Sequence, residues 1–148
     1  MSSLDKKSNE LLSYIDAIVQ HFVVDNATIN PNDCPMSLSK HEMRIIDILG
    51  QKEYSTMSEL AENIQLAVST LTGIIDQMVE KKYVLRGRFA SDRRLVIVKL
   101  DKEGEKLFDL HRKSKEVMTY GILNSLEEEE QDQIIRLFGK IANKITKA

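Results

Sequence analysis

Apolar residues recur with helical spacing over most of the chain. In the segment 4–24 they follow one helical face, at Leu11, Ile15, Ile18 and Phe22. The next segment, 26–36 (NATINPNDCPM), contains both prolines of the chain and is expected to end this helix. Two further long helices are predicted over 101–125 and 127–147. With only two prolines and six glycines in 148 residues, the protein is expected to be mainly helical.

Two capping-box patterns mark the starts of short helices in the middle of the chain. Ser39 followed by Glu42 precedes a run of apolar residues, which predicts a helix that ends near Gly50. Thr56 followed by Glu59 repeats the pattern and predicts a third helix of about two turns. A turn of only a few residues then leads into a longer fourth helix.

This fourth helix, predicted over 68–82, has two chemically different faces. Its apolar face comprises Val68, Leu71, Ile75, Met78 and Val79. Its other face carries Ser69, Thr70, Thr72, Gly73, Asp76 and Gln77. The arrangement indicates a helix-turn-helix, because small hydroxyl and amide side chains reach base edges in a DNA major groove. Gly73 supports this, since a helical glycine costs about 1 kcal/mol relative to alanine and suggests a close approach to the backbone. The alternative is that these residues are neutral surface choices.

A basic hairpin is predicted directly after this helix. In the segment 84–100, VLRGRFASDRRLVIVKL, two β-branched runs flank a turn, whereas Tyr54 and Ser55 can form only a very short strand. From Lys81 to Lys99 there are seven basic residues and one acid, a local charge of +6 on a chain that carries −2. Such a local surface fits binding to a polyanion. Alternatively, the charges only keep an edge strand from aggregating. Together, the helix-turn-helix and the hairpin predict a winged helix.

Composition narrows the class of protein further. The chain is 42% hydrophobic and 30% charged, which is typical of one soluble globular domain. It has no apolar run of about 18 residues and no apolar signal segment at its start, so we expect a cytoplasmic protein without membrane contact. The single cysteine, Cys34, excludes an internal disulfide and argues against a structural zinc site.

The segment 76–104, DQMVEKKYVLRGRFASDRRLVIVKLDKEG, resembles the multiple-antibiotic-resistance regulator (MarR) family of bacterial winged-helix transcription factors. The resemblance extends over essentially the whole chain. It implies that Asp92 orients the wing arginines, that Arg94 enters a minor groove, and that Arg86 braces the base of the wing or contacts phosphate. The helix and the wing together give the expected DNA-binding residues Ser69, Thr70, Thr72, Gly73, Gln77, Arg86, Arg88, Asp92, Arg93 and Arg94.

Three residues depart from the family pattern at helix ends. Lys82 stands where the family has the glycine that ends the recognition helix, so a left-handed conformation must be adopted by lysine or replaced by another turn. Asp101 replaces the usual threonine and remains a good N-cap. Ala67 stands where a serine or threonine caps the recognition helix, and alanine cannot supply that hydrogen bond.

The terminal helices carry more apolar surface than a winged core should be able to cover. The relevant residues after the hairpin are Leu107, Leu110, Val117, Met118, Ile122, Ile134, Leu137, Phe138, Ile141 and Ile145. At about 25 cal/mol per Å², leaving such faces exposed is costly, and burial against a second copy removes the cost. A two-fold dimer would offer two recognition helices to half-sites roughly 34 Å apart, as the family resemblance also implies. The alternative is a monomeric helical core.

These features predict a homodimeric, sequence-specific DNA-binding transcriptional regulator, an effector-responsive repressor of a pseudo-palindromic operator. The domain organisation expected is a single MarR-like domain over 1–148, with a DNA-binding lobe over 37–100 and a helical dimerisation lobe formed by 4–24 and 102–147. Family resemblance implies an effector pocket lined by Tyr14, Ile18, His21, His41, Ile45 and His111. A small apolar or phenolic acid is the usual ligand class. A fatty-acyl compound is the second candidate ligand. The segments SKHEMRIIDILG and LFDLHRKSKEV look like helices of the family's fatty-acid-synthesis repressors.

Other functions have weaker support in the sequence. No phosphate-binding glycine loop, H-E-x-x-H pattern or recognisable nucleophile setting is present, so neither an enzyme nor a cofactor is expected. His21, His41, His111 and Cys34 could form a regulatory metal site, although scattered histidines are more often ordinary helix residues. Cys34 could sense oxidants, but it has no adjacent cationic residue to lower the pKa of its thiol. The rival class is a dimeric protein-interaction module whose basic hairpin docks an acidic partner.

Overall fold

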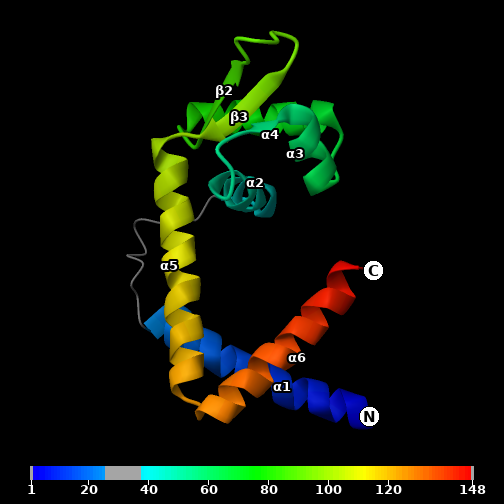
Figure 1. Ribbon diagram of the computed structural model, residues 1–148, viewed down its shortest axis with the longest axis vertical. Helices are drawn as coiled ribbons and strands as arrows, with labels where there is room; N and C mark the ends of the chain where they lie inside the picture. The colour runs from blue at the N-terminus through cyan, green and yellow to red at the C-terminus, as the bar shows by residue number, and fades with distance from the viewer. Residues whose placement is uncertain (1, 26–37, 148) are drawn as a thin grey trace. The chain divides into compact units, whose positions relative to one another are not determined.

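The computed structural model describes residues 2–25 and 38–147, and the chain forms two units. The first unit comprises 1–28 and 113–148, and the second comprises 29–112. The elements in chain order are α1 (Ser3–Val19), the π-helical η1 (Gln20–Asp25), α2 (Lys40–Gly50), β1 (Ser55–Thr56), α3 (Met57–Ile64), α4 (Val68–Glu80), β2 (Val84–Arg88), β3 (Val96–Leu100), α5 (Lys102–Asn124) and α6 (Glu128–Thr146) (Figure 1). The predicted mainly helical, winged-helix fold is confirmed.

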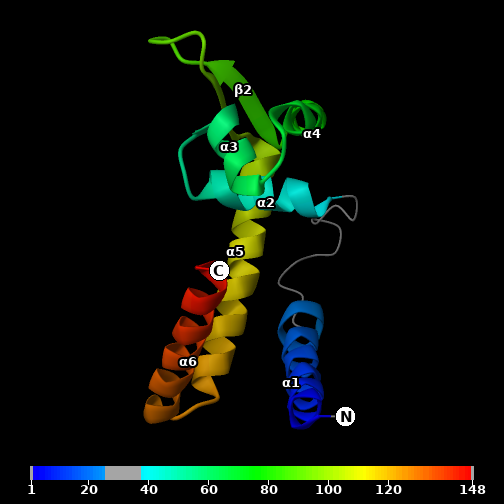
Figure 2. The same ribbon diagram turned by 90° about the vertical axis from the view of Figure 1, so that its right-hand side faces the viewer.

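The second unit holds the whole three-stranded antiparallel sheet, in the order β1-β3-β2. Val84 pairs with Leu100 and Arg88 with Val96, so β2 and β3 form the predicted hairpin. β1 pairs with β3 through Ser55 opposite Val98 and begins one residue later than the sequence suggested. The loop between β2 and β3 projects beyond α2, α3 and α4 (Figure 2). The hairpin is therefore a wing beside the helix-turn-helix formed by α3 and α4.

One hydrophobic core holds the second unit together. It consists of Ile45, Ile46, Leu49, Met57, Leu60, Ala61, Ile64, Leu71, Ile75, Met78, Tyr83, Val84, Val98 and Leu107. Leu107 comes from the first part of α5, which belongs to this unit, whereas the sequence placed all of that helix in a dimerisation lobe. The first turn of α5 packs directly against the backbone at Tyr83, just before β2, because Gly104 has no side chain. A Cβ there would collide with the carbonyl oxygen of Tyr83.

The predicted capping boxes form at the starts of α2 and α3. The Ser39 hydroxyl accepts from the Glu42 backbone N–H at 3.1 Å, and the Thr56 hydroxyl accepts from that of Glu59 at 3.1 Å. Each glutamate returns a carboxylate oxygen to the backbone N–H of its cap residue. Both helices therefore begin where the spacing of the capping residues predicted.

The ends of α3 and α4 adopt a left-handed conformation without glycine. Gln65 has φ 62° and Lys82 has φ 63°. After Lys82, the Tyr83 N–H donates to the Met78 carbonyl at 2.9 Å and the Lys82 N–H donates to that of Val79 at 3.1 Å, the pairing of a Schellman motif. Lysine thus adopts the conformation for which the family pattern has glycine. At the start of α4, Ala67 makes no side-chain cap, as expected.

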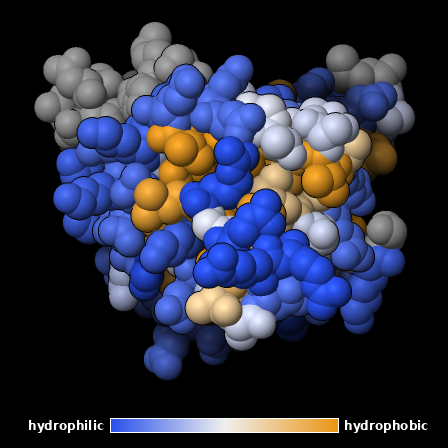
Figure 3. Space-filling model, turned by 90° about the horizontal axis from the view of Figure 1, so that it is seen from above, coloured by the Kyte–Doolittle hydropathy of each residue, from blue (hydrophilic) through white to orange (hydrophobic). Residues whose placement is uncertain are grey.

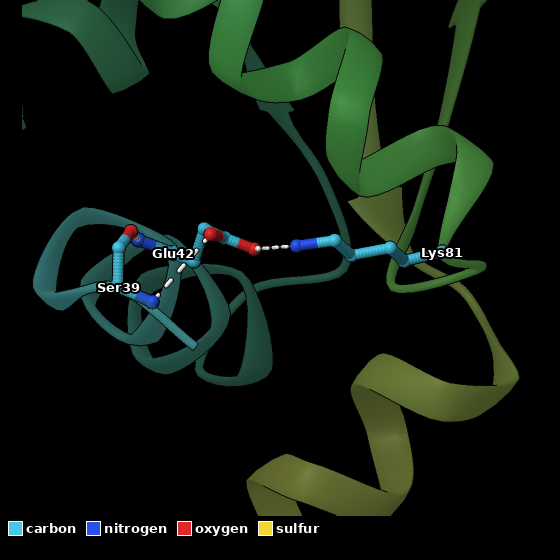
Figure 4. A network of polar contacts seen from close by, with 3 residues as sticks. All are labelled: Ser39, Glu42 and Lys81. Carbon is cyan, nitrogen blue, oxygen red and sulfur yellow. Dashed lines mark hydrogen bonds and ion pairs between the residues drawn. The ribbon is translucent and has the colours of Figure 1, made fainter. Parts of the chain in front are cut away.

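An ion pair with a buried carboxylate joins the start of α2 to the end of α4. The side chain of Glu42 is only 8% exposed, and its Oε2 lies 3.3 Å from Nζ of Lys81. Its Oε1 accepts from the Ser39 backbone N–H at 3.5 Å, so both carboxylate oxygens have a partner (Figure 4). Lys81 follows α4 directly and so holds that end of the helix against α2.

The first unit is an assembly of helices with little buried surface of its own. Phe22, in the π-helical turn, packs against α5 at Gly121, where any Cβ would meet its ring. α1 was predicted as one helix to residue 24, but its last part has π geometry. Within the described residues, neither α1 nor α6 has a buried side chain. The large exposed apolar residues are Leu4, Leu11, Leu12, Tyr14, Ile15 and Val19 on α1, Tyr120 on α5, and Ile135, Leu137, Phe138, Ile141 and Ile145 on α6.

We expect Lys82→Gly to raise the free energy of unfolding by about 1 kcal/mol, because glycine adopts a positive φ without the steric cost that a Cβ brings. Urea denaturation of the full chain at a fixed concentration measures this. Glu80→Gly, in the last turn of α4, is the matched control and should lower the free energy of unfolding by about 1 kcal/mol. Destabilisation by both changes would contradict the left-handed helix end.

Candidate nucleic-acid interface

The outward face of α4 is open to solvent over its whole length. Leu71, Ile75 and Met78 are completely buried. The exposed residues on the other side are Ser69, Thr70, Gly73, Asp76 and Gln77. A Cβ added at Gly73 would meet no atom within 4 Å, so this glycine leaves the backbone of the helix accessible. All the predicted polar residues of this face are thus exposed, with the exception of Thr72, which is half-buried.

Thr72 is half-buried and already uses its hydroxyl hydrogen. Its Oγ1 donates to the Val68 carbonyl at 2.8 Å, one turn earlier in the helix. The oxygen remains available as an acceptor, and the methyl group remains available for apolar contact. Val68 itself was predicted to lie on the buried face, and that prediction is wrong. It is 50% exposed because it is the first residue of α4, beyond the part of the helix that covers the core.

Local hydrogen bonds order the tip of the wing. Oδ1 of Asp92 accepts from the backbone N–H of Arg94 at 3.1 Å and from its Nε at 3.2 Å. The side chain of Arg94 is nevertheless 93% exposed. Arg88 donates from Nη1 to the carbonyl of Arg93 at 2.6 Å, which ties β2 to the loop. Asp92 therefore orients an arginine that extends into solvent.

The base of the wing is joined to α4 by an ion pair. The guanidinium of Arg86, on β2, contacts the carboxylate of Asp76 on the outward side of α4. Both side chains are partly exposed, so the pair is screened by salt and contributes modestly to stability. Its geometry matters more, because it links the two elements expected to contact DNA. Of the two alternatives for Arg86, the structure shows the bracing contact.

A groove of about 570 Å³ lies between α3, α4 and the wing. Its lining consists of Thr56, Met57, Ser58, Val68, Thr72, Arg86, Gly87, Arg88, Arg94, Leu95 and Val96. Three arginines line it, of which Arg86 is paired with Asp76 and Arg94 with Asp92, whereas Arg88 bonds to a backbone carbonyl. An anion in the groove would meet all three guanidinium groups. Seen from the wing side, the face is mostly hydrophilic, with separate hydrophobic residues exposed between the polar ones (Figure 3). Sequence reasoning missed Ser58, although the first helix of a helix-turn-helix commonly crosses the DNA backbone.

The expected effector residues are divided between the two units. Tyr14, Ile18 and His21 belong to the first unit, and the remaining three belong to the second. Ile45 is completely buried in the core, His41 is exposed, and Nδ1 of His111 lies 3.1 Å from Oδ1 of Asp47. The pocket therefore stays a prediction.

The metal and redox hypotheses have no further support from the described residues. Cys34 lies outside them. Within 2–25 and 38–147, no group of three or more histidine, cysteine, aspartate or glutamate side chains is placed to hold a metal ion. None of the helices in that part of the chain combines the length and apolar character that crossing a membrane requires.

Comparison with known proteins agrees with this geometry. Residues 38–96 match the model of the MarR family. The HTH-type transcriptional regulator PchR of Bacillus subtilis is 23% identical over 84% of this chain and 75% of its own length. Streptococcus pneumoniae FabT, solved in complex with DNA, is 26% identical, with a TM-score of 0.69 over 96% of this chain and 94% of that one. A MarR-like transcriptional regulator from Thermotoga maritima shares the fold, with 19% identity and a TM-score of 0.75 over 99% and 98%.

A double-mutant cycle tests the brace between α4 and the wing. Asp76→Ala and Arg86→Ala should each lower stability slightly, with a coupling of about 0.2 to 1 kcal/mol that shrinks as salt is raised. Urea denaturation of the parent, both single variants and the double variant measures the coupling. Zero coupling at low salt would show that the pair does not form in solution.

Proposed function

This chain belongs to the MarR family of transcriptional regulators, and on that premise we propose that it binds double-stranded DNA in a sequence-specific manner. The outward face of α4 would enter a major groove, and the wing would reach the neighbouring minor groove or backbone. The residues proposed to contact DNA or to position those that do are Ser69, Thr70, Thr72, Gly73, Gln77, Arg86, Arg88, Asp92, Arg93 and Arg94.

The observation that carries this proposal is the groove between α3, α4 and the wing. It combines three arginines with hydroxyl groups from two helices. Arginines neutralise phosphates, while hydroxyl and amide groups on α4 suit base edges. The solved DNA complex of FabT, similar in sequence and fold over nearly the whole chain, supports the same partner. Because the members of the MarR family are transcriptional regulators, the match to this family favours DNA binding over an enzymatic function.

We further propose that the regulator acts as a homodimer. Among the described residues, the large apolar side chains of α1 and α6 are exposed in a single chain. Exposed apolar surface of this extent normally marks a protein interface. A second copy would cover it and would place two copies of α4 at half-sites of a pseudo-palindromic operator, roughly 34 Å apart.

An effector would then control DNA affinity. We propose a repressor that acts in the cytoplasm and binds a small apolar or phenolic acid, or a fatty-acyl compound. Tyr14, Ile18, His21, His41, Ile45 and His111 remain the candidate residues. The ligand can release DNA only if it binds more tightly to a dimer whose recognition helices are spaced wrongly for the operator.

Selection of bound duplexes from a random pool at physiological salt tests sequence-specific binding. The proposal requires enrichment of a short pseudo-palindrome. Recovery of DNA without enrichment would instead favour a protein-interaction module with a basic hairpin, because phosphate contacts alone carry no sequence information.

On an enriched duplex, Arg94→Ala should weaken binding by about 1 to 3 kcal/mol, because the variant loses the exposed arginine that Asp92 orients. Fluorescence anisotropy over a salt series measures this. Arg136→Ala, on the polar side of α6, removes the same charge and should leave affinity nearly unchanged. Equal effects of both changes would show that net charge, rather than the wing, determines binding.

Phe138→Asp should weaken the dimer by at least about 2 kcal/mol, because burial of an aromatic side chain is lost and a charge enters an apolar interface. Analytical ultracentrifugation measures the monomer–dimer equilibrium. Asn143→Asp adds the same charge on the polar side of α6 and should leave the dimer intact. A parent protein that is monomeric at all concentrations would contradict the dimer.

A further inference from the structure

Val68 is one of four apolar residues that line the groove between α3, α4 and the wing, together with Met57, Leu95 and Val96. It is the first residue of α4 and is 50% exposed, whereas Leu71, Ile75 and Met78 on the same helix are completely buried. Its side chain lines the groove together with Thr72 and the wing arginines. The exposed valine at the start of the recognition helix therefore contributes little to the core, and its side chain is accessible to a molecule bound in the groove.

The chemistry of a DNA major groove gives an accessible valine a partner. Residues at the N-terminal end of a recognition helix are the ones that contact base edges. Thymine is the base that presents a methyl group in the major groove, and apolar side chains recognise it by contact with that group. The adjacent Thr72 lies one turn further along and donates its hydroxyl hydrogen back to the Val68 carbonyl. Its methyl group is thus available beside the valine.

We propose that Val68 is a specificity-determining residue that recognises a thymine in each half-site through the C5-methyl group. This inference rests on the proposed DNA-binding function and adds to it the base that one position of α4 prefers. The hydroxyl and amide residues further along the helix would read neighbouring base pairs by hydrogen bonds. The wing arginines would hold the DNA backbone against the groove.

Removal of single methyl groups from the DNA tests this contact. A duplex enriched by the parent protein is prepared with each thymine replaced in turn by deoxyuridine, which lacks only the methyl group. We expect one thymine per half-site at which the replacement weakens parent binding about four-fold, the contribution of one buried methyl group. In Val68→Ala the same replacement should change affinity by less than about 1.5-fold, because the partner of the methyl group is gone.

Leu95→Ala is the matched control for loss of an apolar side chain. Leu95 is 42% exposed and lines the same groove, but it belongs to the wing. This variant should keep the full sensitivity to deoxyuridine at the position that depends on Val68. Circular dichroism should show that both variants retain the helical content of the parent, since both side chains are exposed.

The outcomes separate this inference from the function on which it rests. If a sequence is enriched but none of its thymines is sensitive to loss of the methyl group, the proposed role of Val68 is wrong. Sequence-specific DNA binding would still be supported. Equal sensitivity in the parent and in Val68→Ala would do the same, because another residue would then contact the methyl group. Failure to enrich any sequence would overturn both the proposed function and this inference.

Discussion

The burial of one face of α4 is the constraint on which the rest of the interface depends. Leu71, Ile75 and Met78 have no exposed surface, and each contributes about 1.5 to 3 kcal/mol by leaving water. The helix cannot rotate about its axis without exposing them. The outward residues are therefore presented in one fixed order, although they add little to stability themselves. Specificity for a partner can change at these positions while the fold is retained.

Two polar contacts turn this fixed helix into part of a larger surface. The Glu42–Lys81 pair holds the end of α4 against the start of α2. The exposed Asp76–Arg86 pair joins the middle of α4 to the base of the wing. Salt screens the first pair less than the second, because the side chain of Glu42 is 8% exposed and that of Asp76 is 53% exposed. If Arg86 contacts DNA as proposed, phosphates that approach it would compete with Asp76 for the same guanidinium group.

Local signals in the sequence predicted the helix starts and the wing well. The capping residues Ser39 and Thr56 act through hydrogen bonds three residues away, so their pattern is visible in the sequence alone. The exposure of Val68 could not be predicted from the sequence. Periodicity gives the direction in which a side chain points, but it does not show where the core beneath the helix ends. Likewise, no pattern of residues predicted the π-helical turn at 20–25 or the position of Ser58 in the groove beside the wing. Both depend on contacts between distant segments.

Hydroxyl-radical footprinting of the full chain on an enriched duplex tests the central claim most directly. The account predicts that the sugars protected on each strand form two clusters separated by about one helical turn, with further protection in the flanking minor grooves that the wings reach. It also predicts that the flanking protection is lost in a wing variant while the central clusters persist. Uniform protection along the duplex would contradict the account, because it would mean that the chain binds DNA by charge without placing α4 in a groove.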